Sequence, residues 1–336
     1  MKIKGIGFLL IFFSFLSTGL AQIHIAGYLS LEYIKGQEQS YAYLGSFKNS
    51  QLGLLFSGDV APQFDYAAEL RSEETQIKIE QAWIRYKPSE SFMLSVGIFL
   101  VPFGKYNQMN RPHQTILINP PLHVEEMYPS RWRDLGMMVE GQISSFFYSA
   151  FIGNGLGENE DLRGGQQFED NNKDKAMGAR AGVFLSQNLA VAFSYYREKY
   201  DEDNIRYLTF QGADLVWRAE DFQILAEYSK AKLENPEPYS SGEVKGYFVQ
   251  VSFDIDSFRP VLSYQYLEYN DPFHGPGFVL PSYPGGGILE EKRRWSFGLV
   301  YFLAPTLLFK LEYDSNLEKD LELKNNTISA QVALGF

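Results

Sequence analysis

The sequence predicts an all-β fold, a transmembrane antiparallel β-barrel of 16 strands with an inward-folded long loop. Three observations point to it: alternation at the carboxyl end, about sixteen strand-like segments, and connections that alternate in length. In the last ten residues, polar or small residues separate five apolar ones, Ile328, Ala330, Val332, Leu334 and Phe336. Because successive strand side chains point to opposite faces, one face here is apolar. A barrel needs such a last strand to close its wall, although a sandwich could also end on one.

The strand-like segments are spread over the whole chain without a linker or a low-complexity tract. One strand with its connection takes about 20 residues, and an even strand number of this size is typical of bacterial barrels. The predicted strands are 23–34, 50–58, 63–72, 76–87, 91–101, 134–143, 146–153, 175–185, 188–199, 205–218, 221–232, 243–255, 258–269, 292–303, 305–316 and 326–336.

Several of these strands alternate between apolar and polar residues. In 305–316, Leu311 and Tyr313 oppose Lys310, Glu312 and Asp314, and 134–143, 221–232 and 292–303 follow the same pattern. Lipid outside and water inside require this arrangement. Aromatic residues make up 16% of the chain, enough for belts at both membrane interfaces, although a β-rich core could also hold them.

The amino-terminal segment reads as a secretory signal peptide. Lys2 and Lys4 precede an apolar stretch over 6–16, and Gly19 and Ala21 stand at the −3 and −1 positions of a cleavage site. We therefore expect a signal peptide over 1–21 and a single barrel domain over 22–336. The first predicted strand follows at Ile23, so we expect no amino-terminal plug domain.

The connections sort by length. Tight turns are expected at 88–90, 144–145, 186–187 and 304–305, whereas 102–133, 154–174, 233–242 and 270–291 are long. Counted from a periplasmic amino terminus, all four long connections fall on the extracellular side, as barrels of this kind require.

The longest connection, 102–133, is the candidate constriction. Its five prolines exclude a strand or a long helix, and its apolar stretch 116–118 favours packing inside a wide lumen. Folded inward, its charged side chains would meet permeating solutes and sort them by charge. A solvated outer loop is the alternative. The predicted constriction residues are Lys105, Arg111, His113, His123, Glu125, Glu126, Arg131 and Arg133.

Three passages resemble the phosphate-selective porin family and related Gram-negative porins. They are Leu94–Gly104 (LSVGIFLVPFG), Pro129–Gly141 (PSRWRDLGMMVEG) and Phe151–Gly155 (FIGNG), in the family's order. The resemblance implies a sixteen-stranded, often trimeric porin of the bacterial outer membrane with an inward third loop. Its implied partners are outer-membrane lipid and lipopolysaccharide, the barrel-assembly machinery acting on Phe336, and two further copies of the chain.

We therefore expect a porin for the passive diffusion of small hydrophilic solutes and ions. The alternatives are a channel specific for anions such as phosphate or for oligosaccharides, and a secreted or periplasmic carbohydrate-binding β-protein. No enzymatic activity, cofactor or metal is expected, since none of the four histidines stands in an HExxH motif, no GxSxG occurs and Cys is absent. Because acidic residues outnumber basic ones, nucleic-acid binding is not expected either.

Charge sets the expected selectivity. Removal of Lys2 and Lys4 with the signal peptide takes the net charge from −11 to −13. Alternation predicts seven acidic side chains in the lumen (Asp65, Glu69, Glu140, Glu227, Asp254, Glu312 and Asp314) against four basic ones (Arg71, Arg85, Arg180 and Lys310). We expect weak cation preference or near-neutral conduction. The acidic connection 154–174 could hold Ca²⁺ or bridge lipopolysaccharide, but a solvated acidic loop is the simpler interpretation.

Overall fold

The structure is a computed structural model that describes residues 23–73, 76–159, 162–237, 241–270, 291–319 and 322–336. The expected signal peptide and its cleavage site therefore lie outside the described residues, as does most of the connection 270–291.

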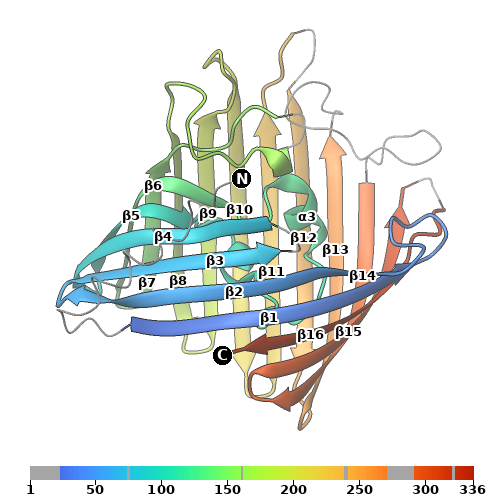
Figure 1. Cartoon of the computed structure of the whole chain (residues 1–336). Coiled ribbons are helices and arrows are strands. Elements are labelled where there is room, and N and C mark those ends of the chain that lie inside the picture. The colour runs from blue at the N-terminus through green and yellow to red at the C-terminus, as the bar shows by residue number, and fades with distance from the viewer. Residues whose placement is uncertain (1–22, 74–75, 160–161, 238–240, 271–290, 320–321) are drawn as a thin grey trace, which may run out of the picture.

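The chain forms one closed antiparallel barrel of sixteen strands in which each strand pairs with its sequence neighbour and β1 pairs with β16 (Figure 1). The predicted fold class is thus confirmed. The strands are β1 (Ile23–Gly36), β2 (Ser46–Ala61), β3 (Phe64–Glu73), β4 (Gln76–Ser89), β5 (Phe92–Leu100), β6 (Arg133–Ile143), β7 (Phe146–Gly153), β8 (Ala176–Ser186), β9 (Leu189–Lys199), β10 (Tyr207–Ala219), β11 (Phe222–Leu233), β12 (Gly242–Phe253), β13 (Phe258–Asn270), β14 (Glu291–Ala304), β15 (Leu307–Glu318) and β16 (Thr327–Gly335).

The barrel wall is closed by pairing between its first strand, β1, and its last strand, β16. The backbone N–H of Gly27 donates to the carbonyl of Phe336 at 2.8 Å, and the N–H of Phe336 donates back at 2.9 Å. A Cβ on Gly27 would come within 2.5 Å of the Phe336 ring, so glycine is what lets the terminal ring lie against β1. The terminal alternation therefore marks the closing strand.

The inner face of the wall is polar and the outer face apolar, as the alternation predicts. On β15, Lys310, Glu312 and Asp314 point inward and are 1–2% exposed, whereas Leu311 and Tyr313 point outward and are 40% and 42% exposed. The outer face can therefore contact lipid while polar side chains line the interior.

The two rims differ in the length of their connections. One rim, the short-turn rim, carries connections of two to four residues such as 144–145 and 254–257. The other, the long-loop rim, carries 37–45, 101–132, 154–175, 200–206 and 234–241 among its connections (Figure 1). The predicted sorting holds, although β3 and β4 are joined on the long-loop rim by only 74–75.

The largest boundary difference lies at β2, which begins at Ser46 rather than at residue 50. Asn49 has a φ of 52°, and the register with β1 shifts between Ser30 and Glu32. This bulge interrupts the alternation, so the pattern becomes regular only after it.

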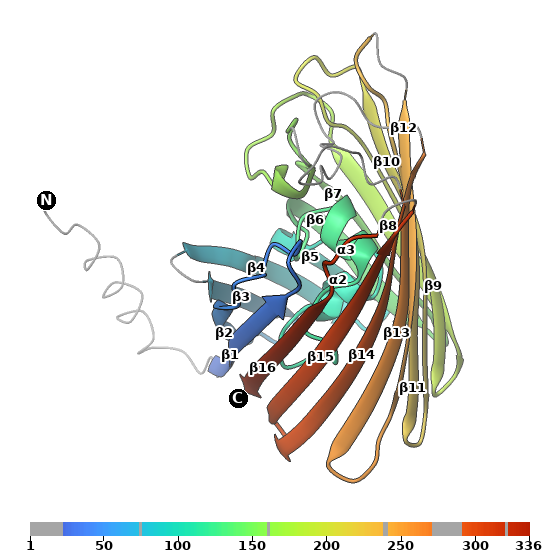
Figure 2. The same cartoon turned by 90° about the vertical axis from the view of Figure 1, so that its right-hand side faces the viewer.

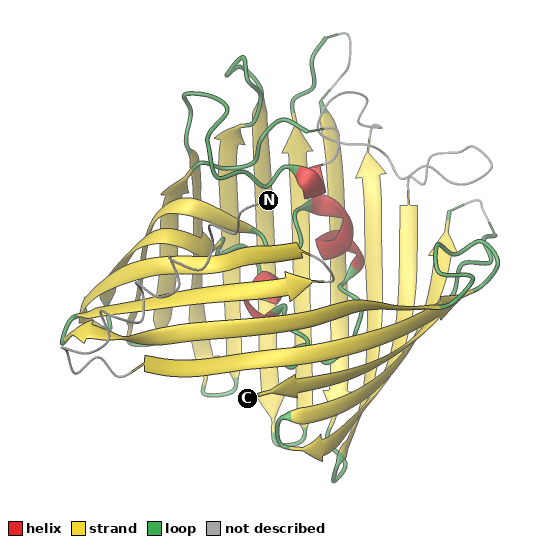
Figure 3. Cartoon of the chain, viewed as in Figure 1, coloured by secondary structure: helices red, strands yellow, loops and turns green. Residues whose placement is uncertain are grey.

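Helices are short and lie inside the barrel. α2 (Tyr106–Met109) and α3 (Leu122–Met127) belong to the connection between β5 and β6. In two perpendicular views both helices lie in the space that the strands enclose (Figures 2 and 3). A 3-10 turn at Leu162–Gly164 lies in a connection on the long-loop rim. No helix of the described residues is long and apolar enough to cross a membrane.

Candidate functional site

The connection 101–132, here called the inner loop, occupies the lumen because its apolar side packs on the inner wall. Phe103, Tyr128 and Trp132 are buried, and the Trp132 ring lies 4.6 Å from that of Tyr196 on β9 and 5.2 Å from that of Phe210 on β10. Aromatic contacts of this kind bury large areas and favour a defined geometry. The predicted inward fold of the loop is confirmed.

A second apolar contact holds the middle of the inner loop. Ile116 and Leu117 are buried against Val261 on β13, Val300 on β14 and Leu308 on β15. The loop therefore contacts the wall on two sectors, β7 to β13 through its aromatic residues and β13 to β16 through its middle.

Two buried carboxylates of the wall bind the loop backbone. Glu227 on β11 accepts the N–H groups of Lys105 at 2.8 Å and Tyr106 at 2.9 Å. Glu312 on β15 accepts the N–H groups of Ile118 and Asn119. Charge-assisted bonds of this kind are about twice as strong as neutral ones.

Gly104 has a φ of +66°, and a Cβ at this position would lie 2.3 Å from a Glu227 oxygen. Glycine therefore permits both the left-handed turn and the close approach of the loop backbone to the wall carboxylate.

The two ends of the inner loop are tied together by Asn107. Its amide nitrogen donates to the carbonyls of Val101 and Trp132, both at 2.9 Å, and its oxygen accepts the N–H of Trp132 at 2.8 Å. Further along, the Lys310 ammonium on β15 donates to the carbonyl of Pro112 at 2.5 Å. The loop is therefore fixed as a folded unit and at several points of the wall.

Two arginines of the inner loop, Arg111 and Arg131, pair with acids on β3 and β4. Arg111 binds both oxygens of Glu69, at 2.5 and 3.0 Å. Arg133, at the start of β6, lies 3.1 Å from Glu80, which also pairs with Arg71 at 2.6 Å. These residues, with Arg131, form a buried arginine cluster.

Arg131 is the most constrained member of the arginine cluster. Its φ is 53°, its Nη1 donates to the Tyr28 hydroxyl at 2.6 Å, and its Nε donates to the carbonyl of Asn110 at 2.6 Å. Two buried guanidinium nitrogens, Nη2 of Arg131 and Nε of Arg133, have no hydrogen-bond partner among the described residues.

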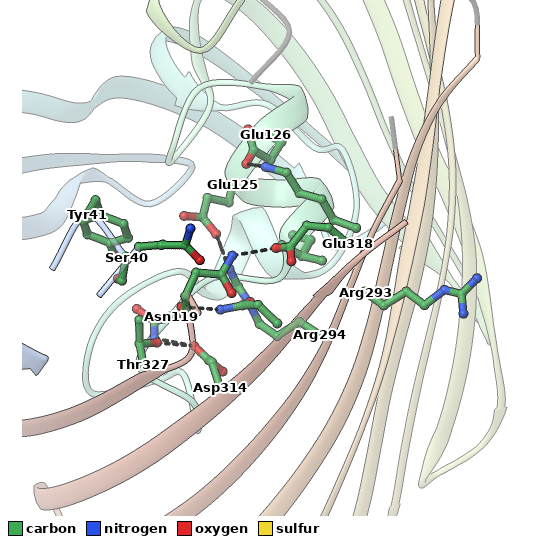
Figure 4. Close-up of a pocket in the computed structure, with 15 residues that line it drawn as sticks. Ser40, Tyr41, Asn119, Glu125, Glu126, Arg293, Arg294, Asp314, Glu318 and Thr327 are labelled. Carbon is green, nitrogen blue, oxygen red and sulfur yellow. Dashed lines mark hydrogen bonds and ion pairs between the residues drawn. The ribbon is translucent and has the colours of Figure 1, made fainter. Parts of the chain in front are cut away.

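Two acids of the inner loop, in α3, pair with bases on β14. Glu125 accepts from Arg294 at 3.2 Å, and Glu126 lies 2.7 Å from Lys292 (Figure 4). The predicted charges of the loop are thus drawn to two separate sectors of the wall, the arginines to β3 and β4 and the glutamates to β14.

Two cavities of about 190 Å³ lie between the inner loop and the sector from β14 to β3. Glu125, Arg294 and Asp314 are among the residues that line the first, nearer the long-loop rim (Figure 4). Arg71, Arg131, Glu32 and Glu73 are among those that line the second. Of the predicted constriction residues, Glu125 and Glu126 border the first cavity and Arg131 borders the second.

Three predicted residues lie apart from these pairs. His123 is fully buried, with its Nε2 3.1 Å from Glu227 and its ring stacked on Phe248, so it holds the loop on the wall. His113 stacks on Tyr28 at 5.3 Å, and burial, followed by the charges of Arg111 and Lys310, lowers its pKa to about 4.

Lys105 is half-buried, and its charge lies in the field of Arg180 and Asp214 rather than in the arginine cluster. Burial, followed by the charge of Arg180, lowers the pKa of the Lys105 ammonium.

Sequence reasoning missed Glu80, Arg294 and Tyr28. The register of β3 and β4 shifts between Glu69 and Leu70, so Glu80 and Gln81 both contribute to the inner face. Such a bulge cannot be recognised from the alternation of apolar and polar residues in the sequence. Arg294, by contrast, could have been found, because it opposes Trp295, which the pattern already placed outside.

The acidic connection 154–174 shows no sign of a cation site where it is described. Asp170 pairs with Lys175, and Asp174 accepts the N–H of Lys199 at 3.0 Å. Glu160 and Asp161 lie outside the described residues, and no group of three metal-ligating side chains occurs within the described ranges.

Comparison with known proteins agrees with this geometry. The sequence profile of the Gram-negative porins matches residues 17–321. An uncharacterized protein of Aquifex aeolicus is 23% identical over 175 residues, which are 50% of this chain and 39% of that protein. The chain thus aligns with about two-fifths of the length of the curated relative it matches.

Solved porins share the fold. A loop L8 deletion mutant of OmpT from Vibrio cholerae has a TM-score of 0.66 at 12% identity, with 95% of this chain and 100% of that chain covered. An anion-selective porin from Comamonas acidovorans has a TM-score of 0.67 at 10% identity, with 94% and 100% covered. With a closed barrel, an inner loop in its lumen and a family profile over most of its length, the chain belongs to the Gram-negative porin family.

Proposed function

We propose that this porin lets small hydrophilic solutes and ions diffuse passively past a constriction between the inner loop and the sector from β14 to β3. The observation that carries the proposal is that the inner loop lies in the lumen and leaves polar cavities between itself and the wall. A narrow polar passage of this kind selects by size and charge.

We further propose weak cation preference or near-neutral conduction. In the arginine cluster, Arg71, Arg111, Arg131 and Arg133 face Glu69, Glu73 and Glu80, and around α3 Lys292 and Arg294 face Glu125 and Glu126. Paired charges of opposite sign leave little net field, and the acidic balance of the whole chain favours cations.

A second candidate is an anion channel. It is favoured by Arg71 and Arg131, which line the second cavity. The similar barrel from Comamonas acidovorans is an anion-selective porin. The sign of the reversal potential under a KCl gradient separates the two candidates.

The remaining expectations stay proposals. A homotrimer is supported by OmpT of Vibrio cholerae, one form of which is a trimer. Cleavage after Ala21, a single barrel domain over 22–336, recognition of Phe336 by the barrel-assembly machinery, and contact with outer-membrane lipid and lipopolysaccharide are proposed on the sequence. We propose no catalysis, since the family and fold are those of a channel.

Swelling of proteoliposomes tests passive diffusion directly. Vesicles that contain the folded protein are diluted into isotonic solutions of uncharged sugars of increasing size. We expect fast swelling with monosaccharides and a steep decline with larger oligosaccharides. Rates equal to those of protein-free vesicles for every sugar would refute the proposal.

A further inference from the structure

The outer surface of β9 to β14 carries a row of basic side chains at the long-loop rim. Each points outward, because its neighbours in the strand, such as Glu198, Ala231 and Val244, are buried on the inner side. Figure 4 shows the contrast on β14, where Arg293 projects away from the lumen and Arg294 into it. We call this row the outer basic belt, and it consists of Arg197, Lys199, Lys230, Lys232, Lys245 and Arg293.

The belt lies at the edge of an outward-facing layer of aromatic rings. Tyr228, Tyr247 and Tyr266 are direct neighbours in register on β11, β12 and β13. Below them the Tyr264 ring lies 4.7 Å from that of Trp295. Rows of Tyr and Trp on the lipid-facing surface of a barrel mark the depth of the lipid headgroups. The basic side chains thus stand at headgroup level.

The charges of the belt are not balanced by acids on the same surface. Lys230 pairs with Glu243 at 2.7 Å, Lys245 pairs with Glu268 at 3.0 Å, and Arg293 pairs with Glu291. Lys232 is exposed and makes no ion pair among the described residues. Arg197 and Lys199 lie over the ring of Tyr207, at 4.1 and 5.3 Å from its centroid. Six bases therefore share the surface with three acids, on a chain whose net charge is −11.

The register places two of these cations face to face. Lys230 on β11 lies directly opposite Lys245 on β12. Like charges in this position destabilise a sheet. An anion bound between neighbouring cations at the edge of the membrane would offset that cost, since polybasic surfaces at this depth attract anionic headgroups.

We propose that the outer basic belt binds the phosphate groups of anionic lipids in the leaflet on the long-loop side. This inference deepens the lipid contact proposed above by naming its surface and its chemistry. Attraction between these basic side chains and the lipid phosphates would hold a shell of anionic lipid around β9 to β14. Residues that face the lumen take no part in this binding.

The test compares two triple variants of the full chain that lose the same number of charges. Lys230→Gln/Lys232→Gln/Lys245→Gln removes two paired and one unpaired lysine of the belt. Lys87→Gln/Lys173→Gln/Lys324→Gln removes two lysines paired with Glu90 and Glu38 and one exposed lysine outside the belt. Heat-modifiable gel mobility first establishes that both variants fold.

The folded proteins are incorporated into phosphatidylcholine vesicles with and without phosphatidylglycerol, extracted, and analysed for retained lipid by native mass spectrometry. We expect the belt variant to retain phosphatidylglycerol at least about tenfold more weakly than the parent at low salt, and the control variant to behave like the parent. The corresponding triple Lys→Arg variant should restore retention.

Equal losses in both triple variants, or parent-like retention in the belt variant, would overturn the proposal. So would displacement of the lipid by inorganic phosphate at low concentration, since that would indicate a site for free anions. Conductance separates this inference from the channel proposal, because a belt variant that binds no lipid should still conduct like the parent.

Discussion

The carboxylate of Glu227 on β11 accepts the backbone N–H of Tyr106 at 2.9 Å, across 121 residues of sequence. The same side chain also meets Lys105, His123 and Tyr128. One wall residue therefore holds both helical segments of the inner loop. The size of the passage depends on such contacts, since the inner loop lies in the lumen.

We predict that Glu227→Gln loosens the inner loop while leaving the barrel closed. Loss of charge-assisted bonds to two backbone N–H groups should weaken loop docking by about 1.5–3 kcal/mol. Trypsin cleavage after Lys105 or Arg111 should become faster in the folded protein. Glu140→Gln is the matched control, since Glu140 pairs with Arg85 away from the loop. Equal cleavage rates in the two variants would show that Glu227 does not hold the loop.

Arg131→Gln should shift conduction towards cations. The substitution removes a positive charge from the arginine cluster and leaves Glu69 and Glu80 with less compensation. The reversal potential under a KCl gradient should move in the cation direction, and Glu69→Gln should move it the opposite way. Arg293→Gln, on the outer face of β14, should leave it unchanged. The assignment of the cluster to the passage fails if Arg131→Gln and Arg293→Gln behave alike.

Lys310→Met should raise the open-channel current. The Lys310 ammonium donates to Pro112 and fixes the middle of the inner loop on β15. Methionine has a similar volume and keeps the apolar part of the contact, but it leaves the Pro112 carbonyl without its donor. We expect larger and noisier single-channel currents than in the parent. A current that is smaller, with unchanged noise, would contradict this role.

The protonation of His113 should make the channel less stable in acid. Burial and the charges of Arg111 and Lys310 lower the pKa of His113 to about 4 in the folded protein. The unfolded chain, with a pKa near 6.5, takes up this proton first, so stability declines as the pH falls from about 6.5 to about 4. Thermal unfolding in detergent should show a weaker decline over this range in His113→Gln. An identical pH profile in both proteins would rule out this contribution.

Most of the fold follows from the sequence because a membrane barrel repeats one simple pattern. Every strand has to alternate, and the rims have to differ, so β15 and the closing strand β16 could be predicted residue by residue. The contacts of the candidate site were harder to predict, because a loop has no repeating pattern of apolar and polar residues. The charged residues of the inner loop could be identified from the sequence, but their partners depend on which strands of the wall each residue reaches.

Glu80 illustrates what the pattern cannot contain. Its inward position results from the register shift between β3 and β4. The sequence around Glu80 contains no residue preference from which that shift could be predicted. The burial of His123 likewise depends on Phe248 and Glu227, more than 100 residues away. Tertiary contacts of this kind decide whether a loop residue faces solute or wall.

Single-channel recording in planar bilayers tests the central claim most directly. Purified protein, shown to be folded by heat-modifiable gel mobility, is added to one side of a bilayer in KCl. The structure predicts discrete conductance steps, a current proportional to voltage at low voltage, and a reversal potential near zero or slightly on the cation side under a salt gradient. The absence of ion-conducting steps from folded protein would contradict the assignment of this barrel as an open porin channel.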